Sequence, residues 1–288
     1  MGLFNVDFSK EGPGVSKDSL EKNRFFLFFE ILGRKFTKLI PANLIYFVTL
    51  LPVIAGILLS VRLNPQLFND LSGSGPLFVF TGDIIGLALV FVSLFITGPA
   101  TCAFTYVLRN MQRQEHTWLF SDFKEQFAKN YKQGFLMSVI DILIPFVLYI
   151  GFCFYKFVFP YIMPELSMLA TIFQYVIIVL SIVFAMMHYY IYTMIVTFDL
   201  KFKDIIKNSV IFTFAKLPLN IFISIIIAAV IAVSLWFLFV GLVLSSIFTL
   251  AFLGFFIIYC IYPTIEKSMI APQNDEETTC EKNFEDIK

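Results

Sequence analysis

Three ionisable side chains lie inside or beside long apolar stretches of this 288-residue sequence and are the first candidates for chemistry: Asp83, Asp141 and His188. A carboxylate at the centre of a lipid bilayer costs about 2.5–3.5 kcal/mol on insertion scales, so a deep carboxylate is a functional candidate. Asp83 can lie at the outer interface of its stretch, and Asp141 lies close to the start of its own. For both carboxylates we therefore favour an interfacial or capping role over a binding role.

His188 is the deepest ionisable group, near the middle of its apolar stretch. The stretches that hold Asp141 and His188 are consecutive and are expected to form one hairpin, in which the two side chains differ in depth by about 6 Å at about 1.5 Å per residue. An Asp–His pair would respond to pH, so one hypothesis is an intramembrane polar site of His188, Asp141 and Asp83. The simpler expectation, which we favour, gives each residue a separate backbone or tyrosine partner, such as Tyr149 or Tyr192.

No other residue pattern predicts catalysis, a cofactor or a metal. The four cysteines have neither zinc nor disulfide spacing, and His116 lacks the second histidine of a metalloprotease motif. The phosphate-binding lysine loop, the dinucleotide glycine pattern and the serine nucleophile elbow are missing from the sequence. We therefore expect a protein that is not an enzyme, without catalytic, cofactor-binding or metal-binding residues.

The composition indicates that membrane helices must position these side chains. Hydrophobic residues make up 58% of the chain and charged residues 15%, the mean hydropathy is +0.82, and 37 residues are phenylalanine. A soluble domain has about a quarter charged residues, and this chain has too few polar residues to cover such a surface. The net charge is zero, which gives no sign of a nucleic-acid partner. The partner that the composition predicts is the lipid bilayer.

Six apolar runs approach or exceed the roughly 20 residues that a span needs. They cover residues 39–61, 78–108, 135–159, 169–198, 217–237 and 242–262. The second run is too long for a straight span, and Gly98-Pro99 within it predicts a kink. The last two runs form one apolar stretch, which we expect to turn near Val240-Gly241. The predicted fold class is an all-α polytopic membrane protein with six transmembrane helices.

The distribution of basic residues fixes the expected orientation, because Lys and Arg mark cytoplasmic loops. With six spans, 19 of the 21 basic residues lie on one side and only Arg62 and Lys156 lie on the other. Both termini are then cytoplasmic. The chain divides into a cytoplasmic N-terminal segment with an amphipathic helix (1–38), a membrane domain (39–263) and an acidic cytoplasmic tail (264–288), which we expect to be disordered.

Three cytoplasmic segments carry apolar residues at helical spacing opposite basic residues, which predicts amphipathic helices in the membrane interface. In the first segment the apolar face consists of Phe25, Phe28, Phe29, Leu32, Phe36 and Leu39. Each segment ends in a similar tripeptide before a pair of spans: Phe36-Thr37-Lys38, Phe127-Ala128-Lys129 and Phe214-Ala215-Lys216. One interpretation is a parallel repeat, three copies of an interfacial helix plus a helical hairpin. The other is coincidence, because phenylalanine is abundant and basic residues belong at cytoplasmic ends.

Several short motifs, most of them in the first half of the chain, carry a family resemblance. They are Gly2-Leu3-Phe4-Asn5, Asp7-Phe8, Gly12-Pro13-Gly14-Val15, Arg24-Phe25-Phe26-Leu27-Phe28-Phe29-Glu30, Arg34-Lys35-Phe36, Gly98-Pro99-Ala100-Thr101, Tyr106-Val107-Leu108-Arg109-Asn110 and Ser121-Asp122-Phe123. On these residues the chain resembles the YesL family, uncharacterised bacterial membrane proteins also known as domain of unknown function 624. The second half agrees mainly in hydropathy. The resemblance brings no functional residues with it.

Members of that family tend to be encoded beside oligosaccharide-import and pectin-degradation systems. The resemblance therefore implies an accessory component of carbohydrate uptake in the bacterial cytoplasmic membrane, with sugar-transporter subunits as candidate partners. The alternative is a regulatory or scaffold membrane protein that acts through its cytoplasmic amphipathic segments. A transporter permease itself is disfavoured, because Glu125-Gln126-Phe127 lacks the alanines of a permease coupling loop.

Reporter fusions test the six-span topology. Because of the asymmetry in basic residues, fusions after Val61, Phe159 and Val240 should report the outside, and fusions after Arg113, Lys207 and Met269 should report the cytoplasm. A fusion after Val240 that reports the cytoplasm would remove the last hairpin and change the number of spans.

Overall fold

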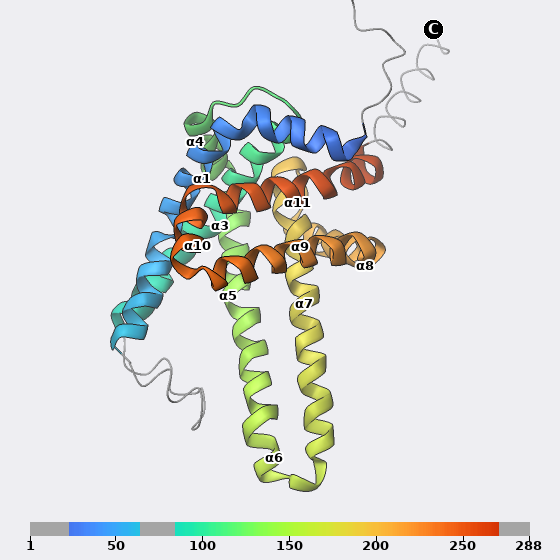
Figure 1. The fold of residues 1–288 in the computed structure, drawn as a ribbon. Coiled ribbons are helices and arrows are strands. Elements are labelled where there is room, and N and C mark those ends of the chain that lie inside the picture. The colour runs from blue at the N-terminus through green and yellow to red at the C-terminus, as the bar shows by residue number, and fades with distance from the viewer. Residues whose placement is uncertain (1–22, 64–83, 271–288) are drawn as a thin grey trace, which may run out of the picture.

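The computed structural model describes residues 23–63 and 84–270, and within these ranges every regular element is a helix (Figure 1). The α-helices are α1 (Arg24–Leu63), α3 (Ile84–Gln112), α4 (Leu119–Lys129), α5 (Tyr131–Cys153), α6 (Phe159–Ile162), α7 (Ser167–Thr197), α8 (Phe202–Ala215), α9 (Leu217–Trp236), α10 (Leu238–Leu244) and α11 (Leu250–Ile265). Three π-helical segments, Phe154–Val158, Ser245–Thr249 and Glu266–Ile270, and the 3-10 turn Pro164–Leu166 extend or join them.

Six helical stretches are long and apolar enough to cross a membrane. They are Arg24–Gly56, Phe91–Gln112, Tyr131–Ile162, Pro164–Thr197, Leu217–Trp236 and Val240–Met269. The predicted fold class, an all-α protein with six membrane-crossing helices, is confirmed, and the chain is a multi-pass membrane protein. Residues 264–270, the first part of the tail that we expected to be disordered, are helical, and residues 271–288 lie outside the described residues. The segment before Asn23, Asp83 and the start of the second predicted span also lie outside them.

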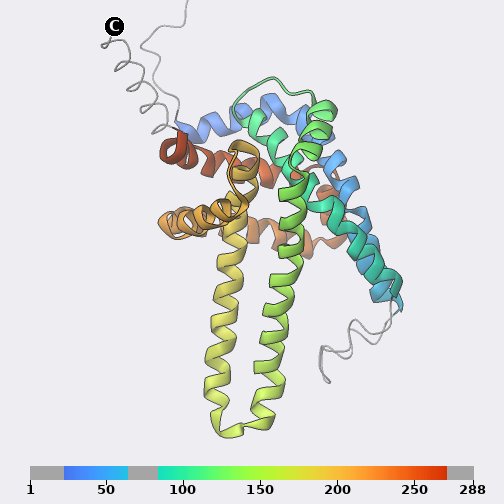
Figure 2. The same ribbon diagram turned by 180° about the vertical axis from the view of Figure 1, so that it is seen from behind.

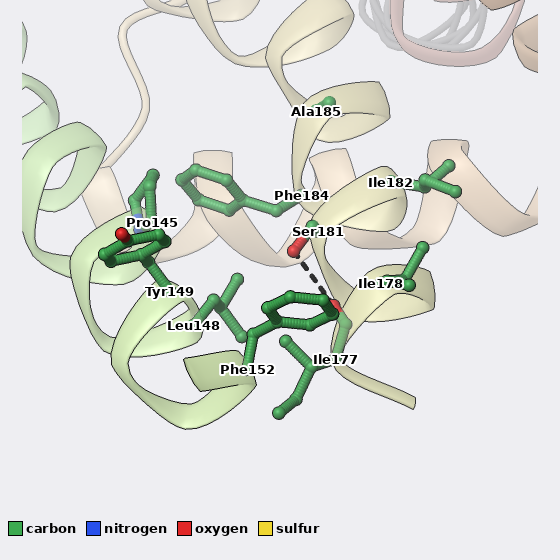
Figure 3. A pocket seen from close by; sticks show the side chains of 10 residues that line it. All are labelled: Pro145, Leu148, Tyr149, Phe152, Ile177, Ile178, Ser181, Ile182, Phe184 and Ala185. Carbon is green, nitrogen blue, oxygen red and sulfur yellow. Dashed lines mark hydrogen bonds between the residues drawn. The ribbon is translucent and has the colours of Figure 1, made fainter. Parts of the chain in front are cut away.

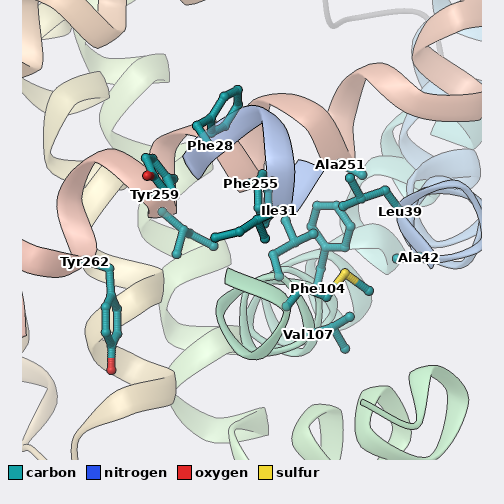
Figure 4. Packing of buried hydrophobic residues seen from close by; sticks show 13 residues of the cluster. Phe28, Ile31, Leu39, Ala42, Phe104, Val107, Ala251, Phe255, Tyr259 and Tyr262 are labelled. Carbon is teal, nitrogen blue, oxygen red and sulfur yellow. The ribbon is translucent and has the colours of Figure 1, made fainter. Parts of the chain in front are cut away.

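Helix α3 is the centre of the fold. In its most apolar window 56% of the residues are buried, against 6–22% in the other five candidate spans. It contacts α1, α4, α5, α7 and α11. Phe104 and Val107 of α3 pack with Phe28 and Ile31 of α1 and with Phe255 of α11 (Figure 4). The most buried of the candidate spans thus sets the positions of the others.

Helices α3 and α5 cross at two glycines. A Cβ on Gly134 of α5 would lie 2.7 Å from the backbone nitrogen of Pro99, and a Cβ on Gly98 would collide with the Gly134 carbonyl. The Gly98 N–H donates to the Ser138 hydroxyl at 2.7 Å. Helix α3 continues through Pro99, where a kink was predicted. What Gly98-Pro99 marks is therefore a close crossing of two backbones, which small residues permit.

The first amphipathic segment is the N-terminal half of α1 and runs without a break into the first candidate span. We expected its phenylalanines to lie in lipid, and Phe25 and Phe29 are exposed. Phe28 is instead buried, with its ring 5.2 Å from that of Tyr259 in α11. The Tyr259 hydroxyl donates to the Arg24 carbonyl at 2.6 Å, which fixes the start of α1 on α11. Part of the predicted lipid face is therefore a contact between helices.

The last apolar stretch turns at Phe237, between α9 and α10, three residues before the predicted position. Gly241 lies against the backbone of Ser234, so the two arms of the turn are in direct contact. In both views α9 and α11 run across the direction of α5 and α7 (Figures 1 and 2). If the membrane normal runs along α5 and α7, then α9 and α11 lie across it. The threefold repeat about an axis along that normal stays a prediction.

The third amphipathic segment forms α8, and its predicted apolar face does lie on one side of the helix. Ile205 and Ser209 are fully buried, whereas Lys203 and Lys207 are exposed. The buried face packs against α7. In α8 the amphipathic pattern identifies the buried face, and its partner in the structure is protein.

The α3–α5 crossing predicts the effect of adding one methyl group. Gly134→Ala should lower the free energy of unfolding in detergent by about 1–3 kcal/mol, because the new Cβ would press on the backbone of Pro99. Gly33→Ala is the matched control, since nothing lies within 4 Å of its added Cβ and alanine favours a helix by up to about 1 kcal/mol. Thermal unfolding of both variants decides the point, and a Gly134→Ala protein as stable as the wild type would contradict it.

Candidate functional site

Asp141 and His188 are in direct contact. The His188 Nε2 atom lies 2.6 Å from Asp141 Oδ1, between α5 and α7. Our favoured expectation of separate partners was therefore wrong, and the reason is the start of α5. The helix begins at Tyr131, one turn before the predicted span, so Asp141 is ten residues from the α5 end while His188 is nine from Thr197 at the α7 end. The depths of the two side chains therefore match.

The other polar atoms of the pair also have partners, all from α7. Tyr192, one turn after His188, donates its hydroxyl to Asp141 Oδ2 at 2.7 Å. One turn before His188, the Phe184 carbonyl lies 2.8 Å from Nδ1 of the imidazole. Residues four apart share one face of a helix, so the sequence spacing alone lines up Phe184, His188 and Tyr192. Helix α5 contributes one side chain to this cluster, Asp141, and both of its carboxylate oxygens are hydrogen-bonded.

A cavity of about 270 Å³ adjoins the pair, bounded by α1, α3, α7 and α11. His188 and Tyr192 line it together with Tyr46, Thr101 and Thr105. The Tyr46 and Thr101 hydroxyls are 3.0 Å apart, and the Tyr46 ring stacks on Phe104 at 4.2 Å. The side chains of Asp141 and His188 are each about a quarter exposed, at 28% and 26%. Protein thus covers about three quarters of each of the two side chains, and the pair adjoins this cavity on the side of the helical core.

A second hollow lies between α5 and α7 alone. This apolar groove has a volume of about 550 Å³ and includes Pro145, Tyr149, Phe152, Ser181 and Phe184 in its lining (Figure 3). Tyr149, one of the two tyrosines proposed as partners for the buried polar groups, lines this groove, while Tyr192 is bonded to the pair. The Ser181 hydroxyl donates to the Ile177 carbonyl of its own helix at 2.9 Å. No polar side chain of the groove is directed at a ligand, so we assign it no chemistry.

Two further tyrosines beside His188 connect α7 to α9. Tyr189 shares a hydrogen bond of 2.9 Å with Ser224, and Tyr190 donates to Asn220 Oδ1 at 2.7 Å. Asn220 is fully buried and also donates to the Thr213 carbonyl at 2.9 Å, where α8 ends. Within residues 188–192, His188 and Tyr192 therefore bind α5, and Tyr189 and Tyr190 bind α9, all within little more than one turn of α7. Sequence reasoning did not identify Asn220, although an asparagine inside an apolar run is a visible signal.

A buried arginine was also missed. Arg109 was assigned to a cytoplasmic loop, but it lies in α3 with 7% exposure. Its guanidinium donates to the Val196 carbonyl at 2.6 Å and to the Thr197 hydroxyl at 3.1 Å. A cation at this place satisfies the last carbonyls of α7 and complements the negative end of its dipole. Arg109 thereby fixes the end of the helix that carries His188.

Asp83, the third residue of the hypothesised polar site, lies outside the described residues. In the described part of the chain no three His, Cys, Asp or Glu side chains are grouped to hold a metal, and the thiols of Cys102, Cys153 and Cys260 are free. The chemistry that the Asp141–His188 contact offers is the binding of a proton between an oxygen and a nitrogen atom.

Comparison with known proteins gives one match. The family described as "Protein of unknown function, DUF624" matches residues 71–152, which include the Gly98-Pro99 crossing, α4 and Asp141. The family resemblance found in the sequence is confirmed over these residues. No curated protein and no solved structure matches the chain.

Removal of one hydroxyl tests the role of Tyr192 in the site. Tyr192→Phe should lower stability in detergent by about 1 kcal/mol, because Asp141 Oδ2 loses its donor. Tyr175→Phe is the control, since Tyr175 is 65% exposed on α7. Thermal unfolding of the two variants should separate them by a few degrees, and equal midpoints would show that the hydroxyl contributes nothing.

Proposed function

We propose that this multi-pass membrane protein is an accessory component of carbohydrate uptake, not itself an enzyme, and that it works through a face formed by α1, residues 113–118 and α4. The observation that carries the mode of action is the way this face is built. Arg34 donates to Gln114 Oε1 at 2.8 Å, and the ammonium groups of Lys35 and Lys38 reach the carbonyls of Glu115 and Thr117. Three basic residues of α1 thus hold the connection between α3 and α4 in place.

This face presents large aromatic side chains. Trp118 is 70% exposed and Phe120 is 73% exposed, and the His116 ring lies 4.9 Å from that of Trp118. Exposed aromatic residues on a fixed backbone are typical of the residues that dominate binding to a protein partner. The carbohydrate assignment has a different source, because it rests on the family resemblance, which implies oligosaccharide import.

A polar pocket lies at the C-terminal end of α4, whose N-terminal end carries Trp118 and Phe120. It has a volume of about 710 Å³ between α4, the start of α5 and the end of α7, and its lining includes Lys129, Lys132, Gln133 and Asp199. Gln133 donates to the Leu200 carbonyl at 2.9 Å, which ties α5 to the chain after α7. We infer that this end of the molecule is cytoplasmic in the bacterial membrane, as the asymmetry in basic residues predicts, and that a sugar-transporter subunit binds there.

The second candidate function is regulation or scaffolding through the same face. The exposure of Trp118 and Phe120 favours a bound partner in either case. The two functions differ in what the partner does, since only the first requires an effect on sugar uptake.

Growth and co-purification test the proposal together. Deletion of the gene should impair growth on complex plant polysaccharide and spare growth on glucose, and a plasmid copy should restore it. A copy with Trp118→Ala and Phe120→Ala should fail to restore growth and should lose co-purifying transporter subunits. Trp236→Ala is the control, because Trp236 is 84% exposed at the far end of α9. Equal growth of the deletion strain and the wild type on several oligosaccharides would favour the regulatory function instead.

A further inference from the structure

We propose that Asp141 and His188 form a reversible proton-binding site. The bound proton holds α5 and α7 together at the point where these two helices leave the helical core. Hydrogen-bond directions carry the first step. The Phe184 carbonyl can only accept, so the 2.8 Å contact places a hydrogen on Nδ1 of His188. In a neutral imidazole the other nitrogen, Nε2, then has a lone pair and no hydrogen.

The contact to Asp141 requires one more proton. Nε2 lies 2.6 Å from Asp141 Oδ1, and an ionised carboxylate oxygen also has lone pairs only. A contact this short between them needs a hydrogen in between, either on the imidazole or on the carboxyl group. Tyr192 donates to the second oxygen, so the carboxyl group is held in position for whichever atom carries the proton. The two contacts together therefore need one hydrogen more than a neutral imidazole beside a carboxylate carries.

Without that proton a single hydrogen must serve both contacts of the imidazole. On Nδ1 it leaves two lone pairs facing each other between Nε2 and Asp141 Oδ1, and on Nε2 it keeps that contact but breaks the one to the Phe184 carbonyl. In either tautomer one of the two hydrogen bonds that hold the ring is lost, which loosens the ring between α5 and α7. Histidine changes charge between pH 5 and 8 in ordinary surroundings. The other titratable groups around the cluster are Tyr46, Tyr189, Tyr192 and Cys102, whose ordinary pKa values of about 10 for tyrosine and about 8.5 for cysteine lie above the range in which histidine titrates. The imidazole is thus the group expected to change its charge in that range.

The position of the pair gives the proton a structural effect. On the core side, α3 crosses α5 at Gly134, and Arg109 of α3 holds the end of α7. On the other side, the contacts of the hairpin are largely between its own two arms, such as the Tyr155–Phe173 stack at 4.9 Å and the bond from Gln174 to the Tyr155 carbonyl. The pair lies between these regions. Binding of a proton there closes the two arms, and its loss loosens them.

The protonation state can be read directly, because the chain has only two histidines. In His116→Gln protein reconstituted in lipid, ¹⁵N magic-angle-spinning NMR would report His188 alone. At pH 6 both ring nitrogens should be protonated, and by pH 9 one should have lost its hydrogen. The Asp141→Asn change on this background should give a neutral ring already at pH 6, whereas Asp204→Asn, an exposed acid on α8, should leave the spectrum unchanged. A ring that keeps one proton, or both, from pH 5 to 9 overturns the proposal.

A double-mutant cycle measures the fastening. For Asp141→Asn and His188→Gln, the stabilities in detergent should be non-additive at pH 6, with a coupling of about tenfold in the unfolding equilibrium constant, and the coupling should be smaller at pH 9. The sign follows from the contact, since stability that depends on a bound proton is present at low pH and is lost as the pH rises. Additive effects at both pH values would show that the proton does not hold the hairpin together. The NMR result stands even where a variant folds poorly, because it needs only the native pair.

Discussion

The constraint on which this structure depends is that a polar group in the interior of a membrane must find its partner within the protein. Helices meet this demand along their length but not where they end or change pitch. The chain solves the problem with buried polar side chains at those places. Asn43 of α1 is fully buried, donates to the carbonyls of Ser245 and Ser246 in the π-helical segment, and accepts from the N–H of Ala251.

The same solution recurs around α7. Asn220 donates to two carbonyls at the end of α8, and Arg109 donates to the Val196 carbonyl and the Thr197 hydroxyl at the end of α7. Ser138 accepts the Gly98 N–H beside a proline that has none to offer. Each interruption of a helix is thereby paired with a side chain from a neighbouring helix, which fixes how the helices pack. The Asp141–His188 pair differs, because its members bind mainly side chains and the proton between them can leave.

The sequence predicts the helices better than it predicts their neighbours. Apolar length and helical periodicity identified six candidate spans and the buried face of α8, but only part of the buried face of α1. They could not tell lipid from protein as the partner of Phe28 or Ile205, because both environments are apolar. Asn43 and Ser246 are more than 200 residues apart, so no local pattern could pair them. Asp141 and His188 were placed in one hairpin, and only the extra turn at the start of α5 kept their contact from being predicted.

The crossing of α3 and α5 also makes the hairpin a lever. Gly134 is the fulcrum, because the backbones touch there and a side chain would prevent the contact. Asp141 lies about 10 Å along α5 from this point, and Ile162, at the end of α6, lies about 42 Å away along the helical arm that α5, the π-helical segment and α6 form, at about 1.5 Å per residue. A rigid tilt that moves Asp141 by about 1 Å therefore carries the tip of the hairpin through about 4 Å. A change no larger than the gain or loss of one hydrogen bond is thereby amplified into a displacement at the far end of the hairpin.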